Sequence, residues 1–257
     1  MSTSLPSNNS FKPSPLRGLG PAESHRAGRL NSGVRTHMPP PRVTKAFVTS
    51  QVNGFKANLA RARDLYKKIV LHGYSGASAA TAVRLTSPDT RDAAQFIFFE
   101  VAAKFEDFAK TMFQVEVRSR LRITVKQSPF VMGDPDQGLN NKLGWGSPQK
   151  LKERGDNILG PTSFFGTLHP TLGAATYNHL VAAHMVRNRI AHSGGQAQTK
   201  FVKHLTAEGI PTAERQGMSV GRYIRDYPSA ASATNKYFFV YLQAYEDFAD
   251  KALAALP

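Results

Sequence analysis

The stretch that decides the fold is DAAQFIFFEVAAKFEDFAK, residues 92–110. It contains no glycine or proline, and its spacing predicts a helix that is apolar on more than one side. Such a helix needs neighbours on several sides, so we expect it at the centre of an all-α bundle. Ser87, Pro88 and Asp89 precede it, and a capping side chain followed by proline is typical of a helix start.

Three further segments have helical periodicity. Apolar residues at steps of three and four predict helices over residues 44–72, 170–192 and 232–256. Gly194 and Gly195 follow the second of these, and we interpret them as the residues that end it.

The positive charge is spread over two different regions. The chain has 33 Lys and Arg against 18 Asp and Glu, a net charge of +15, which favours nucleic acid as a partner. Residues 1–43 are rich in Ser, Pro, Gly and Arg and poor in large apolar side chains, which predicts a disordered basic arm. A mitochondrial transit peptide has a similar composition, although the scattered prolines oppose its amphipathic helix. The body of the protein is residues 44–257.

Composition excludes several classes of protein. With no cysteine in 257 residues, the chain has no disulfide, no thiolate metal site and no cysteine nucleophile. No stretch reaches the roughly 20 apolar residues of a membrane helix, and the first residues lack the apolar core of a secretory signal. We therefore expect a cytoplasmic protein without membrane contact.

Residues 128–166 form a long insertion rich in Gly, Pro, Asn and Asp, which predicts a loop with one short helix near residues 148–154. It has no phosphate-binding Walker spacing. Its Trp145, the one tryptophan of the chain, either stacks on a base or anchors the loop to the body.

The candidate functional motif is MVRNRIAHSGG, residues 185–195, in which Arg187 and His192 are five positions apart. Imidazole exchanges a proton near pH 7 and guanidinium holds a phosphate, so the pair can cleave a phosphodiester without a metal. On a regular helix the two side chains point about 140° apart. Convergence therefore requires the helix to loosen at its end, or a second copy of the motif from a symmetric partner.

A second basic group follows the central helix. Arg118, Arg120 and Arg122 lie on one side of a strand or spread around a helix end, and they form either a solvated rim or an RNA-binding surface. Arg189, within the motif, is a further candidate RNA contact.

The motif resembles the HEPN superfamily, whose signature is R-x(4-6)-H, often with Asn directly after the Arg and Ala directly before the His. Here these residues are Arg187, Asn188, Ala191 and His192. An aromatic helix with Glu100 precedes them, as does the segment LKERGDN at residues 151–157, and this order is most similar to the RiboL-PSP-HEPN branch.

The resemblance implies a dimeric helical bundle that acts as a metal-independent endoribonuclease in defence, toxin-antitoxin or RNA-processing systems, with RNA and an antitoxin or defence protein as partners. It implies His192 as the acid/base group, Arg187 as the group that stabilises phosphate charge and Asn188 as a positioning residue. From the residues themselves, Glu100, Glu106 and Asp107 of the preceding helix are the candidates to orient Arg187, and we expect Glu100, which Phe99 and Val101 flank, to be the buried supporting carboxylate. No metal or cofactor is expected. Toxins of the superfamily that pair with nucleotidyltransferases carry a tyrosine where this chain has Gly194.

Other interpretations of the motif stay open. Arg187 and His192 would also complement the dipole at the end of a helix. His179 and His184 are five residues apart, which differs from the i, i+4 spacing of zinc-binding helices. A non-catalytic module that binds RNA or protein has the same features, as has an enzyme for another phosphorylated substrate.

Overall fold

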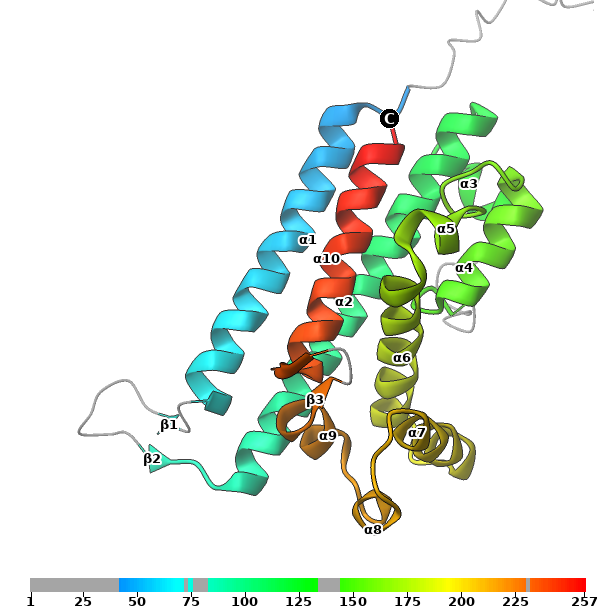
Figure 1. Ribbon diagram of the computed structural model, residues 1–257. Coiled ribbons are helices and arrows are strands. Elements are labelled where there is room, and N and C mark those ends of the chain that lie inside the picture. The colour runs from blue at the N-terminus through cyan, green and yellow to red at the C-terminus, as the bar shows by residue number, and fades with distance from the viewer. Residues whose placement is uncertain (1–41, 72–73, 76–82, 134–143, 230–231) are drawn as a thin grey trace, which may run out of the picture. The chain divides into compact units, whose positions relative to one another are not determined.

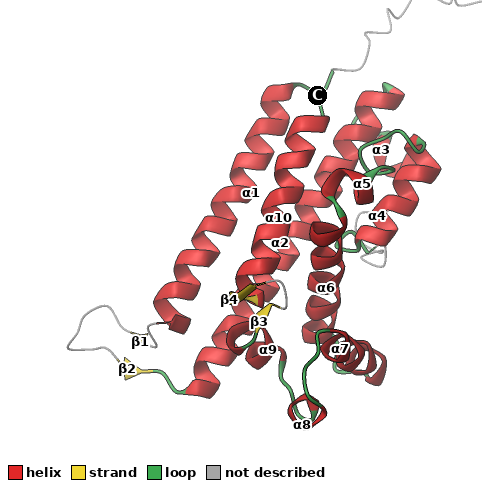
Figure 2. Ribbon diagram, viewed as in Figure 1, coloured by secondary structure: helices red, strands yellow, loops and turns green. Residues whose placement is uncertain are grey.

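Four long helices lie alongside one another in the computed structural model, which describes residues 42–71, 74–75, 83–133, 144–229 and 232–257 (Figure 1). They are α1 (Lys45–Tyr66), α2 (Ser87–Leu121), α6 (Ala174–Ala191) and α10 (Tyr237–Ala255). Helices dominate the described chain, which confirms the predicted all-α class (Figure 2). Residues 1–41 of the predicted arm 1–43 lie outside the described residues. Within the described ranges no helix has the length and apolarity required to cross a bilayer.

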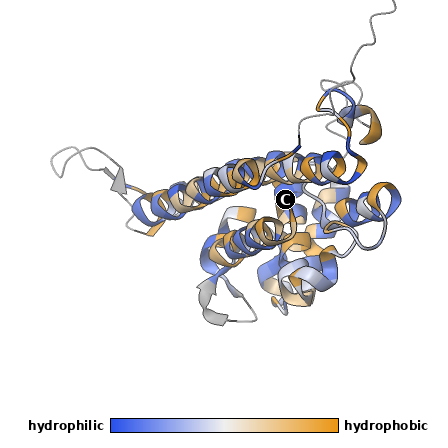
Figure 3. Cartoon of the chain, turned by 90° about the horizontal axis from the view of Figure 1, so that it is seen from above, coloured by the Kyte–Doolittle hydropathy of each residue, from blue (hydrophilic) through white to orange (hydrophobic). Residues whose placement is uncertain are grey.

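The central helix begins where the sequence predicts. Thr86 caps α2, with the Thr86 side chain accepting a hydrogen bond from the Asp89 backbone and the Asp89 carboxylate accepting one from the Thr86 backbone. Apolar residues on several sides of α2 meet α1, α6, α9 and α10. The ring of Phe105, for example, stacks on Tyr245 with centroids 4.3 Å apart. Seen from above, apolar and polar residues alternate along the helical ribbons, in line with the predicted periodicity (Figure 3).

Within the described ranges, two short antiparallel ribbons accompany the helices. The π-helix η1 (Lys67–Leu71) extends α1 and leads to the ribbon of β1 (Tyr74–Ser75) and β2 (Val83–Arg84). The second ribbon joins β3 (Pro228–Ser229) to β4 (Ser232–Lys236). The prediction that the last helix begins at residue 232 was therefore wrong, because residues 232–236 pair with β3 before α10 starts.

The long insertion has more structure than the predicted loop. It contains α3 (Ser128–Val131), α4 (Pro148–Arg154) and the π-helix η3 (Gly155–Leu159), and the short helix predicted at residues 148–154 is confirmed. Its residues 134–143 lie outside the described chain. Helix α5 (Leu168–Leu172) follows and packs beside α6.

The segment after α6 folds differently from the expectation. Gly194 and Gly195 do not end α6; Gly194 is the N-cap of α7 (Gly195–Ala207), whose Phe201 and Leu205 are buried. Glycine is accepted at a helix N-cap as well as at a C-terminus, and this dual use explains the error. Helices α8 (Thr212–Arg215) and α9 (Val220–Asp226) complete the described elements.

Candidate functional site

Helix α6 ends at the motif and turns there. Its last helical residue is Ala191, and His192 adopts an extended conformation with φ of −130° and ψ of 118°. The His192 backbone N–H donates to the Asn188 carbonyl at 3.0 Å, and the Arg189 guanidinium donates to the His192 carbonyl at 3.1 Å. The departure from helical geometry lets Arg187, Asn188 and His192 line one cavity of about 260 Å³.

Arg187 is held by two residues of α2. Its Nη2 donates to Glu106 Oε2 at 2.8 Å, and its guanidinium lies 5.6 Å from the centre of the Phe99 ring. Phe99 and Glu106 are seven residues apart, about two helical turns, and so share a side of α2. The guanidinium is therefore fixed in place by an ion pair and by a cation–π contact.

A hydrogen-bond chain continues from Arg187 along α6. Arg187 Nη1 donates to Asn188 Oδ1 at 3.4 Å, and Asn188 Nδ2 lies 2.9 Å from His184 Nε2. Because an amide nitrogen only donates, His184 Nε2 accepts and the proton is on Nδ1. Burial, and then the charges of Arg187, Lys150 and Lys200, lower the pKa of His184 to about 4. His184 is therefore uncharged at pH 7.

Glu106 sits in an environment that disfavours its charge. Burial raises the pKa of Glu106, and the positive charge of Arg187 only partly offsets this effect. Gly146 lies against the same carboxylate: a Cβ atom there would be 2.7 Å from Glu106 Oε1 and 3.0 Å from His184 Nδ1. The network thus depends on the absence of a side chain at this position.

Trp145 anchors the wall of the cavity. Its ring packs against the Phe113 ring, with the two ring centres 5.5 Å apart. The Arg154 guanidinium lies over the Trp145 ring, 4.5 Å from its centre. Trp145 is buried, which matches the anchoring interpretation of this residue.

The expectation for Glu100 was wrong. Glu100 is exposed, and Glu106 is the carboxylate that contacts Arg187. The two are six residues apart on α2, so they point about 120° from each other. The sequence indicates an aromatic helix with several acidic residues but does not define which of its sides faces α6.

The other predicted arginines do not reach the cavity. Arg118 and Arg120 lie in the last turn of α2, and Arg122 caps it in the left-handed region with φ of 52°. They are 12 to 16 residues beyond Glu106, or about 18 to 24 Å along the helix. Arg120 donates to Glu116 at 2.8 Å and to the Thr162 carbonyl at 3.1 Å. They therefore surround a helix end, one of the two arrangements that their spacing predicts.

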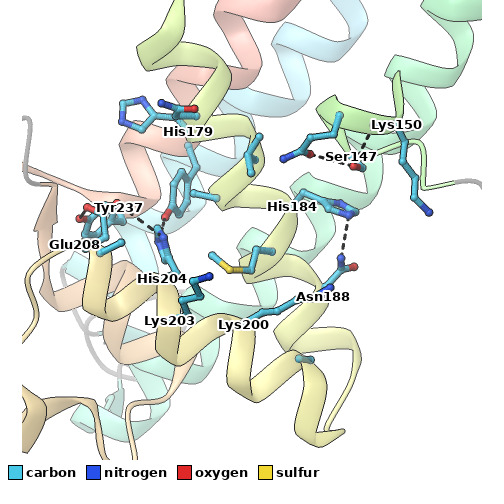
Figure 4. A pocket seen from close by; sticks show the side chains of 18 of the residues that line it. Ser147, Lys150, His179, His184, Asn188, Lys200, Lys203, His204, Glu208 and Tyr237 are labelled. Carbon is cyan, nitrogen blue, oxygen red and sulfur yellow. Dashed lines mark hydrogen bonds and ion pairs between the residues drawn. The ribbon is translucent and has the colours of Figure 1, made fainter. Parts of the chain in front are cut away.

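A second cavity, of about 890 Å³, shares lining residues with the first. Figure 4 shows this larger cavity from close by. It lies between α6 and α7, with residues of α4 and α10 in its walls. Lys150, His184 and Asn188 line both cavities. His184 therefore lies on the boundary between them.

Sequence reasoning missed His184 and Lys150 as site residues. A signal for His184 was present, since His184 and Asn188 have the i, i+4 spacing that places two residues on one helix face. Lys150 had no comparable signal, because its proximity depends on how α4 packs on α6.

Comparisons with models of protein families, with curated proteins and with solved structures found no match. Within the described ranges, no group of three or more His, Asp or Glu side chains is arranged to hold a metal ion.

Proposed function

We propose that this chain is a metal-independent endoribonuclease whose centre is the cavity lined by Arg187, Asn188 and His192. The observation that carries the proposal is that one cavity contains all three residues, although a regular helix would turn Arg187 and His192 away from each other. Lys110 and Lys150 line the same cavity and, with Arg187, outnumber its two carboxylates, Glu106 and Asp107, which favours a phosphate.

The reaction is an attack of the ribose 2′-oxygen on phosphorus. The bond from phosphorus to the 5′-oxygen breaks, leaving a 2′,3′-cyclic phosphate and a 5′-hydroxyl. A base takes the proton of the 2′-hydroxyl, and an acid gives a proton to the leaving 5′-oxygen. His192 is exposed at the rim of the cavity and can do either.

The second proton-transfer group comes from another copy of the chain in this proposal. Among the described residues of the cavity, His184 is the other histidine. Its lowered pKa makes it a weak base and leaves it uncharged at pH 7, and the N–H of a neutral imidazole is too weak an acid to protonate the leaving oxygen. A two-fold homodimer brings two His192 side chains to one RNA strand, so that one acts as base and the other as acid.

Arg187 stabilises the charge that develops on the phosphate oxygens. Glu106 occupies one nitrogen of the guanidinium, and the remaining N–H groups include donors for the phosphate. Glu106 is thus a positioning residue, and Asn188 links the guanidinium to His184. A role in RNA processing, defence or a toxin-antitoxin pair in the cytoplasm, with a cognate partner protein, accompanies this proposal through the HEPN resemblance.

The test is cleavage of mixed cellular RNA in excess chelator. We expect wild type to produce fragments with 2′,3′-cyclic phosphate ends, and His192→Ala to produce none while keeping its helicity by circular dichroism. Cleavage that stops on adding chelator, or that persists in His192→Ala, would refute the mechanism.

A second candidate is a non-catalytic RNA-binding module. The observation that favours it is that Arg187 and Asn188 already have partners within the chain, Glu106 and His184, as in a purely structural network. RNA that binds to wild type and stays intact in the same assay would support this candidate.

A further inference from the structure

The larger cavity has an apolar floor. Val181, Ala182 and Met185 of α6 contribute to its lining, and its volume of about 890 Å³ lies within the range of small-molecule sites, about 300 to 1,000 Å³. A flat organic group fits this kind of surface better than a hydrated ion does.

Its rim is positively charged. Lys150, Lys200 and Lys203 line it, whereas Glu208 is the one carboxylate among the described lining residues (Figure 4). Glu208 accepts a hydrogen bond from the Tyr237 hydroxyl, so part of its charge is engaged within the protein. The charges therefore favour a ligand that carries negative charge beside its apolar part.

Two of its histidines add no charge at neutral pH. Burial lowers the pKa of both His179 and His204. His204 Nε2 lies 2.8 Å from the Tyr223 hydroxyl and 3.3 Å from the Tyr241 hydroxyl, in a network that joins α7 to α9 and α10. This wall is polar and hydrogen-bonded within the protein, while the amide side chains of Gln149 and Asn178 offer donors and acceptors elsewhere in the lining.

The two cavities meet at Lys150, His184 and Asn188. The binding mode that follows has a ligand place an apolar ring in the larger cavity and pass a phosphate beside these residues toward Arg187 and His192. A nucleotide of an RNA strand has this arrangement of ring and phosphate.

We infer that the larger cavity is a base-binding subsite for single-stranded RNA, which receives the base of the nucleotide next to the scissile phosphate. The inference rests on the proposed function. The strand is single because a base held in a cavity cannot be paired at the same time. The subsite gives the enzyme a preference for unpaired regions of its substrate.

The test uses 2′-O-methyl hexanucleotides, which lack the attacking hydroxyl and report binding alone. Fluorescence anisotropy compares a hexamer that carries bases with a fully abasic hexamer of the same backbone charge. We expect wild type to prefer the base-carrying hexamer by tenfold or more, on the order of the contribution of one stacked base. Variants with a filled cavity should lose most of this preference.

Ala197→Trp and Ala207→Trp fill the cavity from two positions of α7, where both alanines line it and neither is fully buried. Gln196→Trp is the matched control, because Gln196 is an exposed residue of α7 outside the lining. Circular dichroism checks that each variant keeps its helicity, and the two filling variants guard against the misfolding of one.

A preference that falls about tenfold in both filling variants and stays in Gln196→Trp supports the inference. An equal preference in wild type and in both filling variants overturns it, as does a failure of wild type to prefer bases. If wild type cleaves RNA but either of these two results is found, the proposed function is supported and only the subsite is refuted. If both filling variants lose the preference for bases but wild type cleaves no RNA, the subsite stands and the proposed nuclease activity is refuted.

Discussion

Removal of Arg187 should destabilise the fold mainly because it leaves the Glu106 carboxylate without its partner. At the observed separation of 2.8 Å, two unit charges attract by about 1.5 kcal/mol in water and about 6 kcal/mol at an effective dielectric constant of about 20. The side chains are 21% and 24% exposed, between the surface and buried cases. Exposed ion pairs contribute about 0.2 to 1 kcal/mol to stability, and loss of one partner of a buried ion pair costs about 3 to 5 kcal/mol. We therefore expect Arg187→Gln to lower the free energy of unfolding by about 2 kcal/mol.

Glu106→Gln should behave differently. Burial raises the pKa of Glu106 in spite of Arg187, which means that the folded protein disfavours the carboxylate charge. A neutral amide of the same shape should change the free energy of unfolding by less than about 1 kcal/mol. Added to Arg187→Gln, it should restore at least about 1 kcal/mol, a coupling that urea denaturation resolves in a double-mutant cycle.

The same cycle has a pH signature. Without Arg187, the pKa of Glu106 loses the main influence that lowers it and rises further. A raised pKa in the folded state gives stability that is present at low pH and lost as pH rises through that pKa. The deficit of Arg187→Gln should therefore be smaller at pH 5 than at pH 8. Equal destabilisation of the single and double variants at all pH values would refute this reasoning.

Two further predictions concern stability. Because the pKa of His184 is lowered to about 4, His184 stays neutral in the folded state, whereas in the unfolded state it takes up a proton near pH 6.5. The free energy of unfolding of wild type should therefore fall by about 3 kcal/mol more than that of His184→Gln between pH 7 and pH 4. Identical urea-denaturation profiles for the two proteins would contradict this prediction. Gly221→Ala should lower the free energy of unfolding by about 2 kcal/mol or more, since its Cβ would lie 2.2 Å from the Arg91 carbonyl oxygen. Gly54→Ala, whose Cβ would have no atom within 4 Å, should raise it by about 0.5 to 1 kcal/mol. Thermal unfolding that ranks the two variants in the opposite order would contradict this prediction.

Much of the fold could be predicted because the strongest helical signals coincide with long helices. The stretch at residues 92–110 favours a helix, since it contains no glycine or proline and is apolar on several sides, and it lies within α2. The boundaries at Gly194 and at residue 232 were harder, because glycine starts and ends helices alike and because the pairing of β4 with β3 overrides the helical periodicity.

The candidate site likewise has one part that the sequence predicts and one part that it does not. Arg187, Asn188 and His192 are close in sequence, so the motif identifies them and one turn of chain brings them to one cavity. Glu106 and Lys150 come from other helices, and their places depend on how α2 is rotated and on how α4 packs. Neither the rotation of a helix apolar on several sides nor the position of a loop-borne helix follows from local periodicity.

The most direct test of the central claim is the single-turnover rate of RNA cleavage in excess chelator for wild type, His192→Ala and His169→Ala. His169 is an exposed histidine of α5 outside both cavities and serves as the control for the loss of an imidazole. Loss of a general acid or base typically lowers a rate about 10²- to 10⁴-fold, so we expect a loss of that size in His192→Ala and none in His169→Ala. Equal rates in all three proteins would contradict the assignment of His192.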